Sequence, residues 1–129
     1  MRKIRQPAHG PEFKIQADLI RFLQARGWHV ERLVGGAFQM GLPDLIAFHP
    51  KWGSRFIEVK NAKRYSFTHA QKIKFPILES FKVGIWILTD TTQEEYDKLF
   101  AAPNWRSYWK PSWKTPTQDE IDKMLEALK

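Results

Sequence analysis

The chain has no cysteine and no long apolar segment, and both absences narrow its possible functions. Without cysteine, the 129-residue chain forms no disulfide and no thiolate zinc site, which is consistent with a reducing compartment. No apolar run approaches the roughly 18 residues of a membrane span, and the basic N-terminus is not followed by the apolar core of a signal peptide. We therefore expect an intracellular protein, cytoplasmic or nucleoid-associated, with no membrane partner.

Acidic residues are scarce in most of the chain. The sequence has 14 Asp or Glu against 21 Lys or Arg, a net charge of +7, and the excess lies in residues 1–90, which hold fifteen basic and seven acidic residues. A basic body favours a polyanionic partner such as nucleic acid, because neutralised phosphates release counterions. A basic surface that only aids solubility is the alternative. Carboxylates kept within the basic region, including Asp44 and Glu58, are better explained by a bound cation than by solubility.

The apolar pattern predicts one α/β domain over residues 1–129. With 43% hydrophobic and 14% aromatic residues, the chain can bury a core. One helix is expected from Pro11 to about Arg26, and a second begins at Thr68, where a capping box with Gln71 marks its start. Strands are expected over residues 28–34, 45–48, 55–60 and 85–88. Because a helix separates the last two strands, we expect them to pair in parallel, in a mixed sheet flanked by helices.

The core over about 11–90 is followed by a C-terminal extension over about 91–129, with helices expected over 92–100 and 117–128. Tryptophan recurs there every four residues, each time followed by Arg or Lys, at Trp105, Trp109 and Trp113. Aromatic and cationic residues interleaved in this way can stack on unpaired bases and contact phosphates. Large aromatic side chains usually pack, however, and a strap that covers the core or a dimer partner is the favoured interpretation.

The stretch from Gly41 to Lys60 contains the candidate chemistry. Asp44 follows Pro43 just before one expected strand and Glu58 lies near the end of the next, so strand pairing brings the two carboxylates together. Glu58 and Lys60 are two residues apart and share a face of the strand. Two carboxylates suit Mg²⁺, and a neighbouring lysine can hold the attacking water or stabilise charge on a phosphate. The alternative is a turn aspartate beside an exposed ion pair.

Two residues outside this stretch can complete the site. Glu12 lies on the apolar arc of the first helix and can approach the cation directly or through a water; an ordinary first-turn glutamate is the alternative. Gln71 can reach the water or the phosphate, or it serves only the capping box. Further along the second helix, Pro76 is expected to cause a kink or a restart before Ile77. None of the four histidines pairs with another at ligand spacing.

The order helix, strand, strand, strand, helix, strand, with these polar residues, resembles the PD-(D/E)XK nuclease superfamily. It is most similar to the VRR-NUC branch, where a helix glutamate, a G-x-P-D-L stretch, an E-V-K strand and a following glutamine recur. The matching residues are Glu12, Gly41-Leu42-Pro43-Asp44-Leu45, Glu58-Val59-Lys60 and Gln71. Archaeal Holliday-junction resolvases are similar over the same span, from about Glu12 to Leu88. They carry a serine in the loop after the first strand, where this chain has Gly35-Gly36-Ala37, which favours the VRR-NUC branch.

The resemblance implies a restriction-endonuclease-like core and a metal-dependent site. It implies a Mg²⁺ or Mn²⁺ ion held by two carboxylates and one peptide carbonyl, from Asp44, Glu58 and Val59, with Glu12 nearby. Lys60 would position a water that attacks phosphorus in line, and Gln71 would assist, leaving 5′-phosphate and 3′-hydroxyl ends. Small members of both branches act as homodimers on branched or structured DNA, so a homodimer is expected.

Together these features predict a deoxyribonuclease. It would be a metal-dependent endonuclease that hydrolyses phosphodiester bonds in branched or structured DNA, in repair or recombination. Basic residues are predicted to contact the DNA backbone at Arg5, Lys63, Arg64, Lys72 and Lys74. A Holliday-junction resolvase is the alternative within the same chemistry. The contrasting alternative is a basic DNA-binding module without catalytic turnover.

Overall fold

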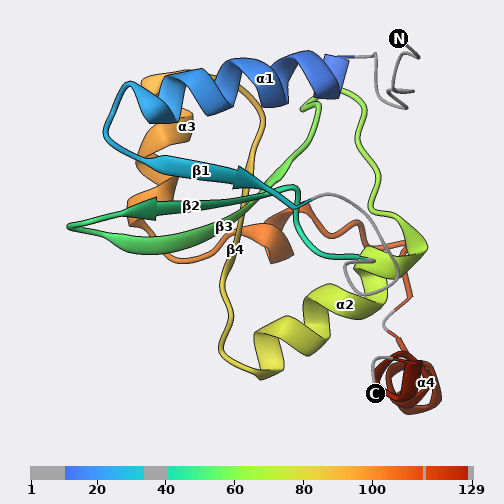
Figure 1. Ribbon diagram of the computed structural model, residues 1–129. Coiled ribbons are helices and arrows are strands. Elements are labelled where there is room, and N and C mark those ends of the chain that lie inside the picture. The colour runs from blue at the N-terminus through green and yellow to red at the C-terminus, as the bar shows by residue number, and fades with distance from the viewer. Residues whose placement is uncertain (1–10, 34–40, 115, 128–129) are drawn as a thin grey trace, which may run out of the picture.

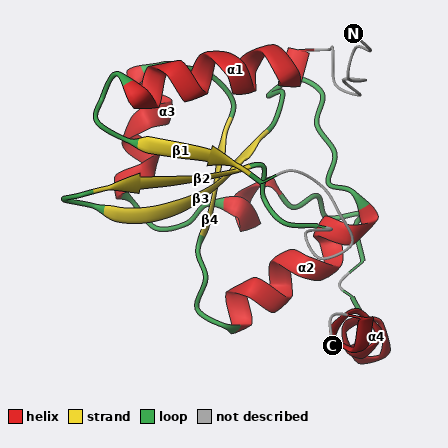
Figure 2. Cartoon of the chain, in the orientation of Figure 1, coloured by secondary structure: helices red, strands yellow, loops and turns green. Residues whose placement is uncertain are grey.

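A computed structural model describes residues 11–33, 41–114 and 116–127, which form a four-stranded mixed sheet with helices on both faces (Figures 1 and 2). The strands lie in the order in which they follow in sequence: β1 (His29–Arg32), β2 (Leu45–His49), β3 (Gly53–Val59) and β4 (Ile85–Leu88). β1, β2 and β3 pair antiparallel, and β3 pairs with β4 in parallel. The predicted α/β class, element order and parallel last pair are confirmed.

Helix α1 (Pro11–Gln24) lies above the sheet in Figure 1, with α3 (Gln93–Asp97) beside it. The short helix η2 (Lys98–Phe100) adds Leu99 to the core layer on the same side of the sheet. The apolar side chains of α1 recur at helical spacing and turn Leu19 and Leu23 into the sheet, where both are fully buried. This core layer also contains apolar residues from alternate positions of the strands, namely Leu45, Ala47, Ile57, Val59 and Leu88. Alternation therefore places Ile57 and Val59 in this layer and leaves Glu58 on the opposite face.

Helix α2 (His69–Ser80) packs on that opposite face, against the β4 side of the sheet, with Phe75 fully buried. Thr68 caps α2, and the predicted capping box with Gln71 is present. The restart expected at Ile77 does not occur, because α2 continues through Pro76 to Ser80. Proline removes one helical hydrogen bond, and burial of the neighbouring Phe75 and Ile77 outweighs that loss.

The tryptophan-rich segment packs against the core, as its favoured interpretation predicted. Trp105 begins the short helix η3 (Trp105–Tyr108) and is buried against Phe75, while Trp109 and Trp113 are half-buried. Rings of Phe67, Trp109 and Trp113 meet at centroid distances of 5.0–6.1 Å. Helix α4 (Gln118–Ala127) follows and lies beside the N-terminal part of α2 (Figure 1). The extension therefore packs against the core through both η3 and α4.

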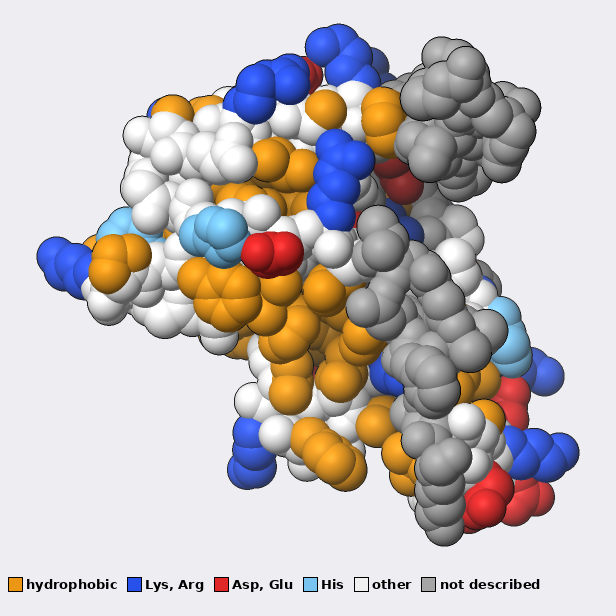
Figure 3. Space-filling view, viewed as in Figure 1, with side chains coloured by type: hydrophobic (Ala, Val, Ile, Leu, Met, Phe, Trp, Pro, Cys, Tyr) orange, Lys and Arg blue, Asp and Glu red, His pale blue; other side chains and the backbone are white. Residues whose placement is uncertain are grey.

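The β1–β2 half of the lower sheet face carries apolar side chains that the described residues leave partly exposed. Alternation turns Ile46 and Phe48 to this face, and Phe48 is 42% exposed. Figure 3 shows hydrophobic side chains gathered across the middle of the molecule in this view. Within the described ranges, no helix combines the length and apolarity needed to cross a bilayer.

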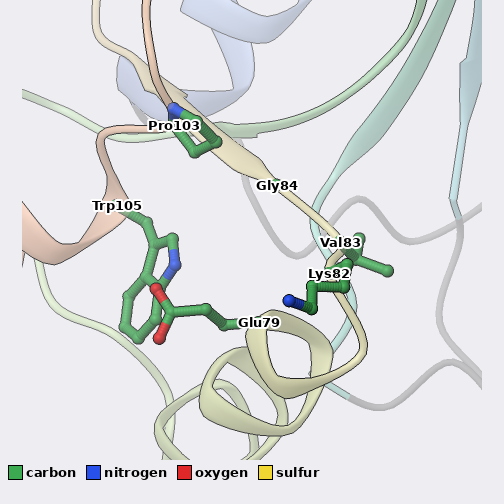
Figure 4. A pocket seen from close by; sticks show the side chains of 6 residues that line it. All are labelled: Glu79, Lys82, Val83, Gly84, Pro103 and Trp105. Atoms are coloured by element: carbon green, nitrogen blue, oxygen red, sulfur yellow. The ribbon is translucent and has the colours of Figure 1, made fainter.

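A hollow of about 230 Å³ lies between the C-terminal end of α2 and the Pro103–Trp105 turn. Figure 4 shows the residues that line it. Gly84 forms its floor, and an added Cβ there would approach Pro103 to 2.6 Å. The carboxylate of Glu79 at its edge is bound by Arg106. This hollow lies at the far end of α2 from Gln71 and contains none of the predicted site residues.

Candidate active site

Asp44 and Glu58 meet where β2 begins and β3 ends. The register pairs Leu45 with Ile57, which brings the residues beside them, Asp44 and Glu58, next to each other. The Asp44 amide donates to Glu58 Oε1 at 3.1 Å, and the Val59 amide donates to Asp44 Oδ2 at 2.9 Å. Each carboxylate is therefore oriented by the backbone of the other strand.

The turn before Asp44 depends on Gly41. Gly41 has φ +81°, and an added Cβ would lie 2.6 Å from the carbonyl oxygen of Ala70 in α2. Only glycine combines this backbone conformation with so close an approach. Pro43 is fully buried, so the segment that carries Asp44 packs directly on the first turn of α2, beside Gln71.

Lys60 and Gln71 bind the second oxygen of Glu58. Lys60 Nζ lies 3.0 Å from Glu58 Oε2, and Gln71 Nε2 donates to the same oxygen at 2.8 Å. Lys60 also donates to the Ser66 carbonyl at 2.8 Å and to Gln71 Oε1 at 3.2 Å. Glu58, Lys60 and Gln71 are only 2%, 4% and 6% exposed. All three ammonium hydrogens of Lys60 therefore have acceptors, inside the protein rather than in solvent.

Gln71 serves the helix cap and the polar cluster at once. Its Oε1 accepts from the Thr68 amide at 3.0 Å, and its own amide donates to Thr68 Oγ1 at 3.1 Å. The same side chain contacts Glu58 and Lys60 through its two ends. The two interpretations of Gln71, cap and site, are therefore compatible, because the capping box holds the amide in the orientation that the cluster needs.

Glu12 lies at the edge of this cluster. Its Oε2 accepts a hydrogen bond from the Asn61 amide at 3.1 Å, directly after Lys60. Its negative charge is close enough to contribute to the raised pKa of Asp44. The first turn of α1 thus reaches the end of β3, as predicted, while direct or water-mediated metal contact by Glu12 stays a prediction.

The two carboxylates resist being ionised together. Burial is the main cause that raises the pKa of Glu58 to about 8, and the charge of Asp44 adds to it, against the opposing effects of Lys60 and Gln71. Burial also raises the pKa of Asp44, while the Val59 amide and Lys60 oppose that shift. A positive charge bound between the carboxylates would favour the doubly ionised form.

The donor set fits a hard divalent cation. Both side chains offer carboxylate oxygens, and Asp44 Oδ1 accepts no hydrogen bond from the described residues. Mg²⁺ commonly takes one or two protein carboxylates and completes its shell with water and phosphate. Across residues 11–33, 41–114 and 116–127, no group of three or more His, Asp or Glu is arranged to hold a metal. Asp44 and Glu58 are the two predicted ligands whose segments are joined by hydrogen bonds, and metal binding by them, by the Val59 carbonyl and by Glu12 stays a prediction.

The residues predicted to contact DNA differ in accessibility. Lys63 and Arg64 are exposed in the segment after Lys60, and Lys72 is half-buried. Lys74 is 4% exposed and burial lowers its pKa, so it is not part of the exposed basic surface. Arg5 lies outside the described residues. DNA contact by this set stays a prediction.

Two contacts of Lys60 were not predicted from the sequence. One is the Ser66 carbonyl, and the other is Phe67, whose ring centroid lies 5.2 Å from Lys60 Nζ. A backbone acceptor leaves no signal in the side-chain sequence. Phe67 had a possible signal, because a large apolar residue directly before a helix cap commonly packs inward.

No protein-family model matches the chain, and no curated protein matches it. Among solved structures, the chain is similar to Hjc, a Holliday junction resolvase from the archaeal hyperthermophile Archaeoglobus fulgidus. The TM-score is 0.45 and the sequence identity 21%, over 60% of this chain and 67% of that chain. Membership of the PD-(D/E)XK superfamily, and of its VRR-NUC branch, stays a prediction.

Proposed function

We propose that the chain is a metal-dependent endonuclease that hydrolyses phosphodiester bonds in branched or structured DNA. The observation that carries the proposal is the buried cluster of Asp44, Glu58, Lys60 and Gln71 at the end of β3. Buried ion pairs stabilise a fold poorly compared with apolar residues of similar volume. Ionisable groups with strongly shifted pKa values, such as Glu58, are enriched at functional sites.

Each residue of the cluster has a definable role in hydrolysis. Asp44 and Glu58 would hold Mg²⁺ or Mn²⁺, which supplies positive charge at the phosphate and acidifies bound water. Lys60 would exchange its contact with Glu58 for the attacking water or a phosphate oxygen, while the Ser66 carbonyl and Gln71 keep its ammonium in place. Gln71 would keep Glu58 oriented during that exchange.

The charge of the chain supports a nucleic-acid substrate. The net charge is +7, and Lys63 and Arg64 are exposed directly after the cluster. Phosphate neutralisation by such residues gives salt-dependent binding. Within the same chemistry, the sequence resemblance supports a preference for branched DNA, with a junction resolvase as the narrower alternative, and a homodimer is expected.

The test compares cleavage of supercoiled plasmid and a synthetic four-way junction in Mg²⁺, Mn²⁺ or EDTA. We expect cleavage that requires the metal and is lost in Asp44→Asn and Lys60→Met, while DNA binding persists. Matched controls are Asp18→Asn and Lys98→Met, which remove the same charges from ion pairs outside the cluster. Both controls should keep wild-type cleavage.

Binding without cleavage in every metal would instead support the alternative of a DNA-binding module without turnover. Cleavage that survives both Asp44→Asn and Lys60→Met would place the active site elsewhere or identify a contaminating nuclease. Junction cleavage far faster than plasmid cleavage would favour the resolvase alternative.

A further inference from the structure

A second hollow, of about 300 Å³, lies between the first turn of α2 and the C-terminal extension. Its size is at the lower end of the range for small-ligand sites. The polar and aromatic residues that line it come from both segments: His69, Lys72, Ser112, Trp113, Lys114 and Glu120. Helix α4 lies beside α2 here (Figure 1), so the hollow exists only because the extension folds back on the core.

The hollow has an excess of positive charge. Among the described residues, Lys72 and Lys114 form no ion pair with a carboxylate. Glu120 is the one acid of the lining, and it caps α4 by accepting from the Thr117 amide at 3.0 Å. That hydrogen bond is the main cause of its lowered pKa, so Glu120 stays ionised but already has its partner. The two lysines are therefore available to an anion.

Trp113 gives the hollow an aromatic wall. Its ring packs nearly perpendicular to Tyr65 and Trp109, at interplanar angles of 85°, which fixes its orientation. Lys72 Nζ lies 4.6 Å from the ring centroid and Lys110 Nζ lies 5.7 Å from it. An indole of fixed orientation beside cations that have no carboxylate partner is the combination that binds unpaired nucleotides, by stacking on the base and neutralising the phosphate.

The hollow is connected to the candidate active site through one ring. Phe67 lies 5.2 Å from Lys60 Nζ on one side and 5.0 Å from the Trp113 ring on the other, as centroid distances. Lys72 also follows Gln71 directly in α2. A DNA strand held in this hollow would therefore lie next to the candidate active site, whose Lys60 is itself buried.

We propose that this hollow binds an unpaired nucleotide of the strand that is cut, with its base against Trp113 and its phosphate at Lys72 and Lys114. This inference rests on the proposed nuclease function and names the feature that the substrate must have, a single-stranded arm next to the cleaved phosphate. The extension would then select branched or tailed DNA over plain duplex.

The test is a binding measurement without metal. Fluorescent blunt duplex and the same duplex with a single-stranded tail are titrated with the full-length chain in EDTA, by anisotropy at several salt concentrations. We expect the tail to strengthen binding about tenfold, and Trp113→Ala and Lys72→Gln each to remove most of that gain. Lys72→Gln should also lower the salt slope for the tailed DNA by about 0.7, as for one lost contact with a single strand.

The hairpin end of β2 and β3 offers matched controls. Lys51 Nζ lies 4.8 Å from the ring of Trp52, so Lys51→Gln and Trp52→Ala remove the same pair of groups elsewhere. We expect these two variants to keep the preference for tailed DNA. Should Trp113→Ala fail to fold, as judged by circular dichroism, Lys72→Gln and Lys114→Gln carry the test.

Two results would overturn the inference. One is equal affinity of the wild type for blunt and tailed duplex, and the other is an equal loss on both DNAs in the Trp113 and Lys72 variants. Cleavage without a tail preference would overturn this inference and leave the nuclease proposal standing. A preference for tailed DNA without cleavage in any metal would overturn the nuclease proposal and leave nucleotide binding in this hollow standing.

Discussion

The two ends of the β2–β3 hairpin place the same kinds of residue in opposite environments. At the turn, Lys51 is exposed and lies over Trp52, which is itself 41% exposed. At the other end, Lys60 lies 5.2 Å from the ring of Phe67 but is only 4% exposed and is paired with Glu58. Both ends thus have a lysine beside an aromatic ring, but Lys60 is shielded from solvent and Lys51 is not.

This difference in exposure means that the two lysines contribute differently to the free energy of unfolding. A lysine over a surface ring adds up to about 1 kcal/mol and requires no desolvation. Burying Glu58, Lys60 and Asp44 together carries a desolvation penalty that their mutual attraction only partly offsets. Apolar residues at the end of β3 would hold the same strands together better, which supports the catalytic role that we propose for the polar cluster.

The largest effect is expected when the buried pair is broken. Lys60→Met keeps the side-chain stem against Phe67 but, above about pH 8, where Glu58 is ionised, leaves that carboxylate without its cation. We expect this loss to lower the free energy of unfolding there by about 3 kcal/mol. Metal-dependent cleavage should fall by at least about 100-fold if, as we propose, Lys60 positions the attacking water. Urea denaturation and the plasmid assay measure the two effects. Lys51→Met is the control at the other end, and a similar loss there would remove the contrast between the ends.

The next largest effect is expected when alanine replaces each of two glycines that share the same φ angle. Gly41 and Gly53 both have φ +81°, but an added Cβ meets Ala70 at 2.6 Å in the first case and nothing within 4 Å in the second. Gly53→Ala should therefore lower the free energy of unfolding by about 1–2 kcal/mol, the cost of placing alanine in the left-handed conformation. Gly41→Ala should lower the free energy of unfolding by about 3 kcal/mol or more, because the clash with the Ala70 backbone adds to the conformational cost. Thermal unfolding checks the order, and equal losses would mean that the segment at Gly41 can move away from α2.

The pH dependence of stability should be steeper for the wild type than for Glu58→Gln. The pKa of Glu58 rises from 4.5 to about 8 on folding. Between these values the folded chain keeps a proton that the unfolded chain has lost, so stability falls as pH rises, by at most about 1.4 kcal/mol per pH unit. Above about pH 8 the effect ends, since both states are then ionised.

Urea denaturation in EDTA from pH 5 to pH 9 measures these slopes. Glu58→Gln removes the titrating group and should flatten the profile, while Asp44, whose pKa is also raised, leaves a smaller slope of the same sign. Mg²⁺ should stabilise the wild type more at high pH than at low pH, since a ligating carboxylate must be ionised. Identical slopes in the two proteins would show that Glu58 is already ionised near neutral pH.

Local patterns in the sequence predicted the framework correctly. Ile85–Leu88 is a strand with the predicted bounds because a continuous apolar run fits only a buried strand there. The Thr68–Gln71 capping box fixed the start of α2, and residue spacing placed Glu58 and Lys60 on one face. The restart expected at Pro76 does not occur, because the burial of Phe75 and Ile77 outweighs the local penalty of proline.

Contacts between distant segments could not be predicted. Lys60 binds the Ser66 carbonyl and is covered by Phe67, and Phe67 in turn packs on Trp113 from the extension. No local pattern links residue 60 to residue 113, because that contact depends on how the extension folds back. The burial of Lys74 could not be predicted either. A charged side chain is normally exposed, so Lys74 was expected to face DNA, and only the tertiary structure shows that it is buried.

The smallest effect is expected for an exposed ion pair, and it tests whether burial is what distinguishes the cluster. Arg106 binds Glu79 through Nε at 3.0 Å and Nη2 at 2.6 Å, with side chains 59% and 45% exposed. Glu79→Gln should lower the free energy of unfolding by less than about 1 kcal/mol, and salt should reduce even that, because water screens the pair. Lys60→Met should lose the same stability at low and high salt. Should Glu79→Gln prove as damaging as Lys60→Met, ion pairing itself would stabilise this fold, and the buried pair at the end of β3 would need no catalytic explanation.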